Sequence, residues 1–78
     1  MLPVTKAFHE FNQLSVKEKL RLIREKAVLL DVDTEKTKVT ELYYLRGFFI
    51  EKVLDRKTGA FIELLPFKNG YRLYNFLS

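Results

Sequence analysis

The sequence contains no cysteine and no tryptophan, and it has only one histidine, two prolines and three glycines among its 78 residues. Without cysteine, neither a disulfide framework nor a zinc–thiolate site can form. His9 has no second histidine one helical turn away, so we interpret it as a surface residue rather than a metal ligand. Gly47, Gly59 and Gly70 are too scattered for a phosphate-binding loop. These absences predict a protein without a metal or another cofactor.

Long apolar runs are also lacking. No stretch approaches the roughly 20 apolar residues of a membrane-spanning helix, and the first ten residues lack the apolar centre of a signal peptide. We therefore expect a soluble, cytoplasmic protein that does not enter a membrane. The length predicts one domain, residues 1–78, and a chain of this size buries only roughly 60% of its unfolded surface.

The charge is moderately positive. Fourteen Lys and Arg against ten Asp and Glu give a formal net charge of +4, and most of the excess lies within residues 15–30. A charge of this size keeps a small domain in solution without any partner. It also permits nucleic-acid binding, for which the candidate contacts are Lys17, Arg21 and Arg24.

Two helices are expected in the N-terminal third. Pro3 can open the first, in which apolar residues recur at helical spacing. Residues 15–18 (Ser-Val-Lys-Glu) have the form of a capping box and start the second helix, over about residues 15–30. Its apolar stripe is formed by Val16, Leu20, Ile23, Ala27 and Leu30.

Strands are favoured from Lys38 onward. Residues 39–45 are β-prone, and we interpret Gly47 as a bulge, because Arg-Gly is a poor match to the usual two-residue turns. The apolar runs 48–54 and 60–65 flank turn-forming residues and predict a β-hairpin. After it, residues 71–78 fit a short helix or a returning strand, and the helix is slightly favoured.

Together these patterns predict an α+β fold, with two N-terminal helices packed on a small antiparallel β-hairpin sheet and a short C-terminal helix or strand. The order of elements resembles that of small bacterial proteins in which helices precede one Phe-rich hairpin, and this resemblance implies no function. One hairpin face is expected to receive the second helix through Phe48, Ile50, Leu54, Ile62 and Leu64.

The opposite, outer face of the hairpin contains the candidate site. If Leu54 pairs with Ala60, then Glu51 lies opposite Glu63 in apolar surroundings. Such a pair could share a proton or hold a cation, but a two-stranded ribbon has no cleft of its own. Alternatively, both carboxylates point into water, or a one-residue shift of the register removes the pairing. Since no nucleophile and base accompany them, we predict no enzymatic activity.

Two short helices can cover only one face of a ribbon. The outer face is therefore expected to stay exposed as an interaction surface, formed by Phe49, Glu51, Val53, Phe61, Glu63 and Leu65. The free edges of the ribbon could also extend a sheet. The predicted function is a protein–protein interaction module that binds a protein partner or forms a homodimer.

Two alternatives stay open. The first helix or residues 71–78 could fold over the outer face and close the core. Alternatively, the basic second helix and the hairpin could form a winged-helix-like nucleic-acid-binding protein, although such domains normally place three helices before the wing. Nucleic acid is therefore the less favoured partner.

Overall fold

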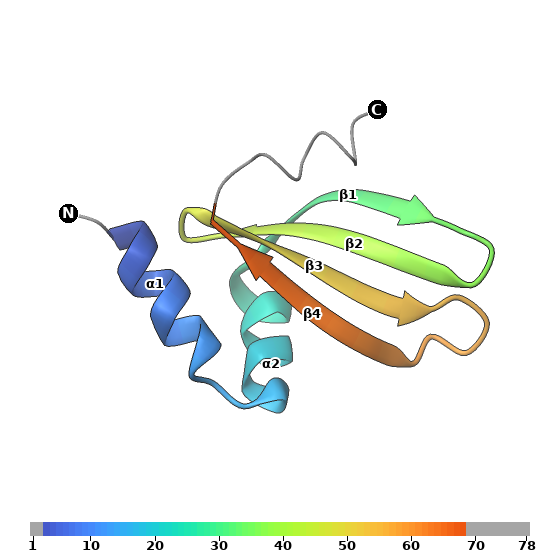
Figure 1. The fold of residues 1–78 in the computed structure, drawn as a ribbon, viewed down its shortest axis with the longest axis horizontal. Coiled ribbons are helices and arrows are strands. Elements are labelled where there is room, and N and C mark those ends of the chain that lie inside the picture. Colours follow the sequence, from blue (N-terminus) through green and yellow to red (C-terminus); the bar gives the residue numbers. More distant parts are fainter. Residues whose placement is uncertain (1–2, 69–78) are drawn as a thin grey trace.

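A computed structural model describes residues 3–68 of the chain. Within them, helices α1 (Pro3–Asn12) and α2 (Val16–Lys26) precede strands β1 (Val28–Thr34), β2 (Lys38–Leu45), β3 (Phe48–Asp55) and β4 (Phe61–Phe67). The strands form an antiparallel sheet in the order β1-β2-β3-β4 (Figure 1). The predicted α+β class, with two helices before an antiparallel sheet, is confirmed. The predicted C-terminal helix or strand lies outside the described residues.

Helix α2 begins as predicted and ends earlier. The Ser15 hydroxyl accepts a hydrogen bond from the Glu18 N–H (3.2 Å), and the Glu18 carboxylate accepts one from the Ser15 N–H (3.1 Å). This reciprocal pair is the capping box. The predicted end near Leu30 is wrong, because Ala27 already has an extended backbone (φ −81°, ψ 153°). Residues 28–34 then pair with β2 as a strand, which overrides the turn preference of Asp31 and its neighbours.

Gly47 belongs to a two-residue turn rather than to a bulge. Arg46 (φ 50°) and Gly47 (φ 94°) both have positive φ, as the type I′ turn of a tight hairpin requires. Leu45 pairs directly with Phe48 across this turn. The left-handed conformation of Arg46 is unfavourable for a residue with a side chain. We attribute its persistence to the eight residue pairs that join β2 to β3.

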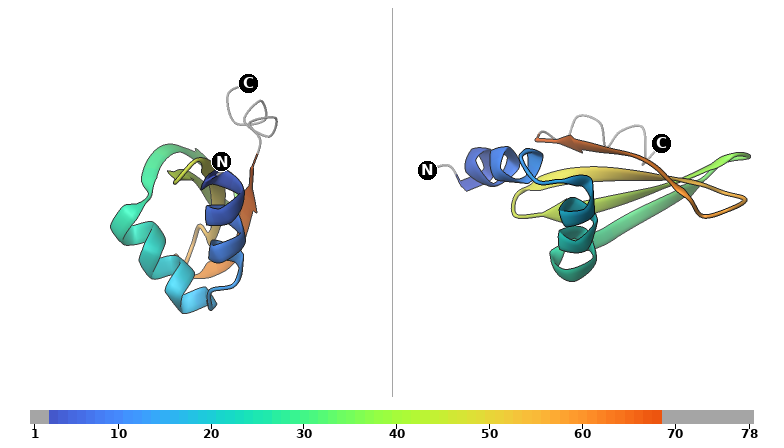
Figure 2. Two further views of the ribbon diagram at one scale, coloured as in Figure 1. Left: turned by 90° about the vertical axis from the view of Figure 1, so that its left-hand side faces the viewer. Right: turned by 90° about the horizontal axis from the view of Figure 1, so that it is seen from below.

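The hydrophobic core lies between the two helices and the end of the sheet that carries the β2–β3 turn. Its buried members are Phe11, Ile23, Leu45, Phe48 and Ile50. The Phe48 ring lies 5.6 Å from that of Phe8, edge to face, and 5.4 Å from that of Phe11. Figures 1 and 2 show both helices at this end, whereas the β1–β2 and β3–β4 turns extend away from them.

Candidate functional site

The β3–β4 turn sets a register different from the predicted one. The Asp55 N–H donates to the Ala60 carbonyl (2.7 Å), and the Asp55 carboxylate accepts bonds from two backbone N–H groups of the turn at 2.8 and 3.0 Å. With the turn closed in this way, Leu54 pairs with Phe61 instead of Ala60. Phe61 therefore shares the helix side of the sheet with Leu54, so its predicted place on the outer face is wrong.

A β-bulge between Phe61 and Glu63 then shifts the ladder by one more residue. Glu63 lies opposite Val53, and Glu51 lies opposite Leu65. The predicted Glu51–Glu63 cross-strand pair is therefore wrong, although the two shifts leave both carboxylates on the outer face. A bulge of this kind adds an unpaired residue without a strong sequence signal.

The outer face does not present the predicted exposed apolar surface. Val53 is 5% exposed and Glu51 is 9% exposed. The ring of Phe49, a half-buried residue, stacks on that of Phe67, with centroids 5.5 Å apart. Leu65 is half-buried, and among the predicted surface residues on this face Glu63 alone is exposed.

Helix α1 does not cover the outer face, because its contacts with the sheet include Phe48 on the helix side. Residues 71–78, the other predicted cover, lie outside the described residues. A binding role for the five predicted residues on this face stays a prediction.

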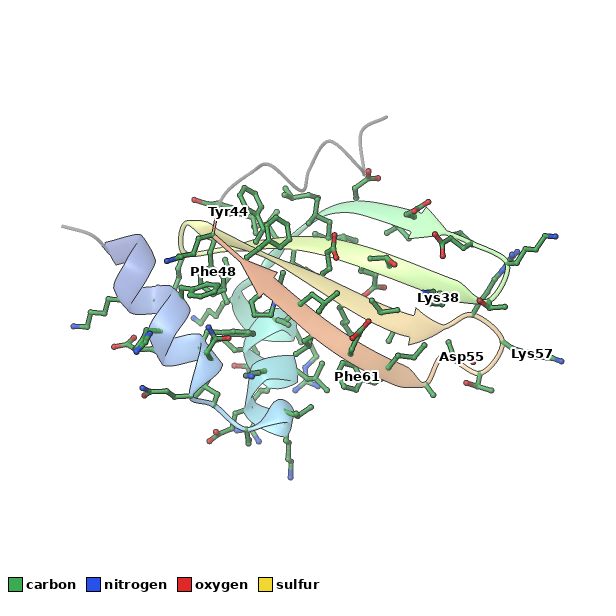
Figure 3. All side chains as sticks on the ribbon, viewed as in Figure 1. Lys38, Tyr44, Phe48, Asp55, Lys57 and Phe61 are labelled. Carbon is green, nitrogen blue, oxygen red and sulfur yellow. The ribbon has the colours of Figure 1, made fainter. Side chains whose placement is uncertain are left out.

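An exposed apolar surface lies instead on the helix side, beyond the helices. Leu29 and Val32 of β1 are 50% and 46% exposed, and Phe61 of β4 is 37% exposed. The pairing of Leu29 with Tyr43 and the alternation along each strand place them on the face that carries the core. Figure 3 shows Phe48 beside α1 and Phe61 farther along the sheet, toward the β3–β4 turn.

Helix α2 and this part of the sheet form a groove with a volume of about 510 Å³, here named the α2 groove. Its apolar lining comes from α2 and from several strands, and includes Leu20, Ile23, Ala27, Leu29, Leu54 and Phe61. The α2 contributors follow the three- and four-residue spacing of one helix face. The groove therefore continues the apolar surface of the core, and no described side chain fills it.

The charged side chains that line the α2 groove are both cations, Arg24 and Lys52. Tyr43 also lines the groove, and its hydroxyl donates a hydrogen bond to Glu41 Oε1 (2.8 Å). Burial, together with this bond to a carboxylate, raises the pKa of Tyr43 to about 12. Lys52 Nζ lies 3.8 Å from the same Glu41 oxygen.

Both edges of the sheet carry features that oppose the addition of another strand. In β1, a bulge interrupts the ladder between Leu29 and Asp31, and the Asp31 carboxylate accepts a bond from the Val32 N–H (2.9 Å). Counting pairs from the hairpin turn places that N–H on the free edge. In β4, Pro66 has no N–H that could bond to another strand, and a bulge near Phe61 interrupts the ladder. Such features are typical of protected edges.

The basic candidates Lys17, Arg21 and Arg24 are all exposed along α2. Arg24 also lines the α2 groove. The acidic neighbour Glu18 is held in the capping box at Ser15. Nucleic-acid binding through the three cations stays a prediction, since no contact among residues 3–68 bears on it.

A second hollow, of about 530 Å³, lies at the β1–β2 and β3–β4 turns and is lined by Lys36, Thr37, Asp55, Arg56 and Lys57. The Arg56 N–H donates to the Thr37 carbonyl and its guanidinium to the Glu35 carbonyl, each at 3.0 Å. These bonds join the two turns. The described lining has no apolar side chain, so this hollow lacks the hydrophobic floor typical of a docking site.

Sequence reasoning missed Leu29 as a strand residue of the groove, although it had placed Leu54 on the helix side and had named Phe61 as an interaction residue. The available signal was the run Val28–Val32 directly after the basic end of α2, which suits a strand as well as a helix. Reading residues 27–30 as helix assigned their apolar side chains to the core.

Among the residues that the structure describes, no group of His, Cys, Asp and Glu is placed to hold a metal ion. In the same residues, neither helix has the length and apolar character needed to cross a membrane. No protein-family model matches this chain, and neither does any curated protein or solved structure. The α2 groove therefore carries the functional argument.

Proposed function

We propose that this protein is a protein–protein interaction module whose α2 groove receives an amphipathic helix of another protein. The observation that carries the proposal is the unequal cover of one sheet face. Phe48 and Ile50 are fully buried beneath the helices, whereas Leu29 and Phe61 on the same face are 50% and 37% exposed. The proposal keeps the functional class predicted from the sequence and moves the site from the outer face to the helix side.

The open part of the sheet has the width of one helix. Ile50 is the last fully buried residue of β3 on this face, and Leu54 lies at the open end. Four residue steps along a strand span about 13 Å, and a helix with its side chains is about 10–12 Å across. A single helix placed beside α2 would therefore extend the helical layer that already covers the core.

A strand is a poorer occupant than a helix. An added strand would have to pair with the free edge of β1 or β4. At β1, the Asp31 carboxylate already occupies the Val32 N–H and a bulge interrupts the ladder. At β4, Pro66 lacks an N–H and a second bulge interrupts the ladder. The α2 groove offers apolar side chains rather than backbone groups. Apolar side chains at helical spacing on a partner can bury them without any edge pairing.

A second copy of this chain is also a poorer occupant. If α2 of the second copy entered the groove, it would bring the exposed cations Lys17, Arg21 and Arg24 with it. Arg24 would then approach the Arg24 and Lys52 of the other groove. Like charges brought together in an interface oppose association. The charges therefore favour a different protein.

The energy available from the groove is modest. Of the groove residues, Leu29 is 50% exposed and Phe61 is 37% exposed, and full burial of such side chains contributes about 1.5–3 kcal/mol each. Burying their exposed parts therefore contributes roughly 1–3 kcal/mol, before the cost of association is subtracted. A helix that binds here must gain further energy from its own apolar face, and binding should be sensitive to single substitutions.

Site-specific photo-crosslinking tests the proposal. A photoreactive amino acid replaces Leu29 in one variant and Val28 in a matched control. Val28 is the neighbouring residue on the same strand, is 57% exposed, and points to the opposite face. We expect a protein crosslink from position 29 and none from position 28, with the crosslinked peptide identified by mass spectrometry. Equal crosslinking from both positions, or a crosslink to nucleic acid, would overturn the proposal.

The identified segment then permits a measurement of affinity with purified components. We expect Leu29→Asp to weaken binding at least tenfold, because it places a charge at the centre of an apolar contact. Val28→Asp adds the same charge and should change affinity by less than about twofold. Similar losses in both variants would show that charge, and not the groove, controls binding. Far-ultraviolet circular dichroism of both variants checks that the fold is retained.

A further inference from the structure

We propose that the α2 groove selects a helix whose apolar face is bordered by a carboxylate, and that Lys52 and Arg24 receive this group. The inference rests on the proposed function and specifies the chemistry of the partner. It is carried by the charged groups that line the groove beside its apolar side chains.

Lys52 is placed to accept such a group. It lies on β3 between Ile50 and Leu54, on the face that forms the groove. Its side chain is 25% exposed. The 3.8 Å separation from Glu41 Oε1 is that of an ion pair but is too long for a hydrogen bond. The three N–H donors of the ammonium group therefore remain available to an incoming carboxylate.

Glu41 balances this charge only in part. Its Oε1 already accepts the bond from the Tyr43 hydroxyl at 2.8 Å, and the same oxygen faces Lys52. Arg24 adds a second positive charge and forms no ion pair with any residue between 3 and 68. Because no acidic side chain is among the described lining residues, the groove is electropositive around an apolar floor. Such a surface complements an acidic amphipathic helix.

Three synthetic peptides of equal length provide the probe. Each is an amphipathic helix with a leucine face, and the positions that border this face are all Glu, all Gln or all Lys. Binding to the full chain is measured by fluorescence anisotropy at low and at high salt. We expect the Glu peptide to bind about two- to fivefold more tightly than the Gln peptide and the Lys peptide to bind most weakly. Added salt should reduce the differences.

Two variants locate the effect. Lys52→Gln should remove most of the preference for the Glu peptide. Lys57→Gln removes the same charge from the β3–β4 turn, outside the groove, and should leave the preference unchanged. An equal loss in both variants would mean general attraction to a basic protein and would overturn the inference.

The outcomes separate this inference from the proposed function. If the three peptides bind equally and compete with one another, the groove docks helices without charge selection, and only the present inference fails. If none binds at up to about 1 mM peptide, the docking proposal itself fails and this inference fails with it. Unfolding curves of Lys52→Gln and Lys57→Gln exclude a loss of fold as the cause.

Discussion

The two halves of the helix side of the sheet have similar side chains and different burial. Near the β2–β3 turn, Phe48 and Ile50 are fully buried by residues of α1 and α2. Beyond α2, Leu29 and Phe61 are as apolar but are 50% and 37% exposed. The difference teaches that apolar side chains on one sheet face do not by themselves identify a core. The extent of the covering helices decides where the core stops and a docking surface begins.

The strongest test of this difference compares two phenylalanines. Phe48→Ala should lower the free energy of unfolding by about 3–5 kcal/mol, because it leaves a cavity beside the rings of Phe8 and Phe11. Phe61→Ala should cost about 1–2 kcal/mol, since 37% of that residue is already exposed to water. Urea denaturation of both variants provides the two values. Equal losses would mean that Phe61 is part of the core and that the groove is not open.

The residues of α2 show what the sequence could predict. The capping box at Ser15 acts between neighbours three residues apart, so its geometry follows from local sequence. Helical spacing also identified Ile23 as buried. The end of α2 could not be identified in this way, because Val28–Leu30 suit a helix or a strand. Pairing with β2, a contact between distant residues, decides between them.

The register of the β3–β4 hairpin was beyond prediction for a similar reason. Its two strands were predicted, but the bonds at Asp55 and the bulge before Glu63 move the pairing by two residues in all. One shift moved Phe61 to the helix side, which changed the candidate site. A single residue in a turn or a bulge therefore decides which face a side chain occupies.

The next test destabilises α2, the helix that lies between the buried and the open half of this face. Ser15→Ala removes the hydroxyl that caps α2 and should destabilise the protein by about 1 kcal/mol. Glu18→Gln removes the charge of the reciprocal bond and should cost less. Thermal unfolding followed by circular dichroism measures both effects. Lys17→Ala, also exposed in the first turn of α2 but outside the capping box, serves as the control and should have little effect.

Acid adds a second readout for the same capping box. The bonds from the backbone and side chain of Ser15 hold the pKa of Glu18 below its ordinary value. The folded state thus binds fewer protons than the unfolded state near the ordinary pKa of about 4.3. The contribution of Glu18 is present above that pH and is lost as the pH falls through the lowered folded value. In Glu18→Gln this part of the acid dependence should disappear, and an unchanged acid profile would contradict the assignment.

The last test concerns Tyr43, which packs against the core and also lines the open groove. Its pKa is raised to about 12, chiefly by burial and further by the bond to Glu41. As the pH rises above about 10, the unfolded chain releases this proton while the folded chain keeps it. Stability contributed by the neutral phenol should therefore fall between about pH 10 and about pH 12.

Tyr43→Phe separates this effect from other alkaline titrations. At neutral pH it removes one hydrogen bond and should cost about 0.5–1.5 kcal/mol. Its stability should then decline less steeply than that of the wild type above about pH 10, because the protonation difference has been removed. Tyr44→Phe on the outer face is the matched control for loss of a phenol. If Tyr43→Phe and the wild type lose stability in parallel above about pH 10, the Tyr43 hydroxyl is in free contact with water. The core would then end closer to Ile50 than the structure places it.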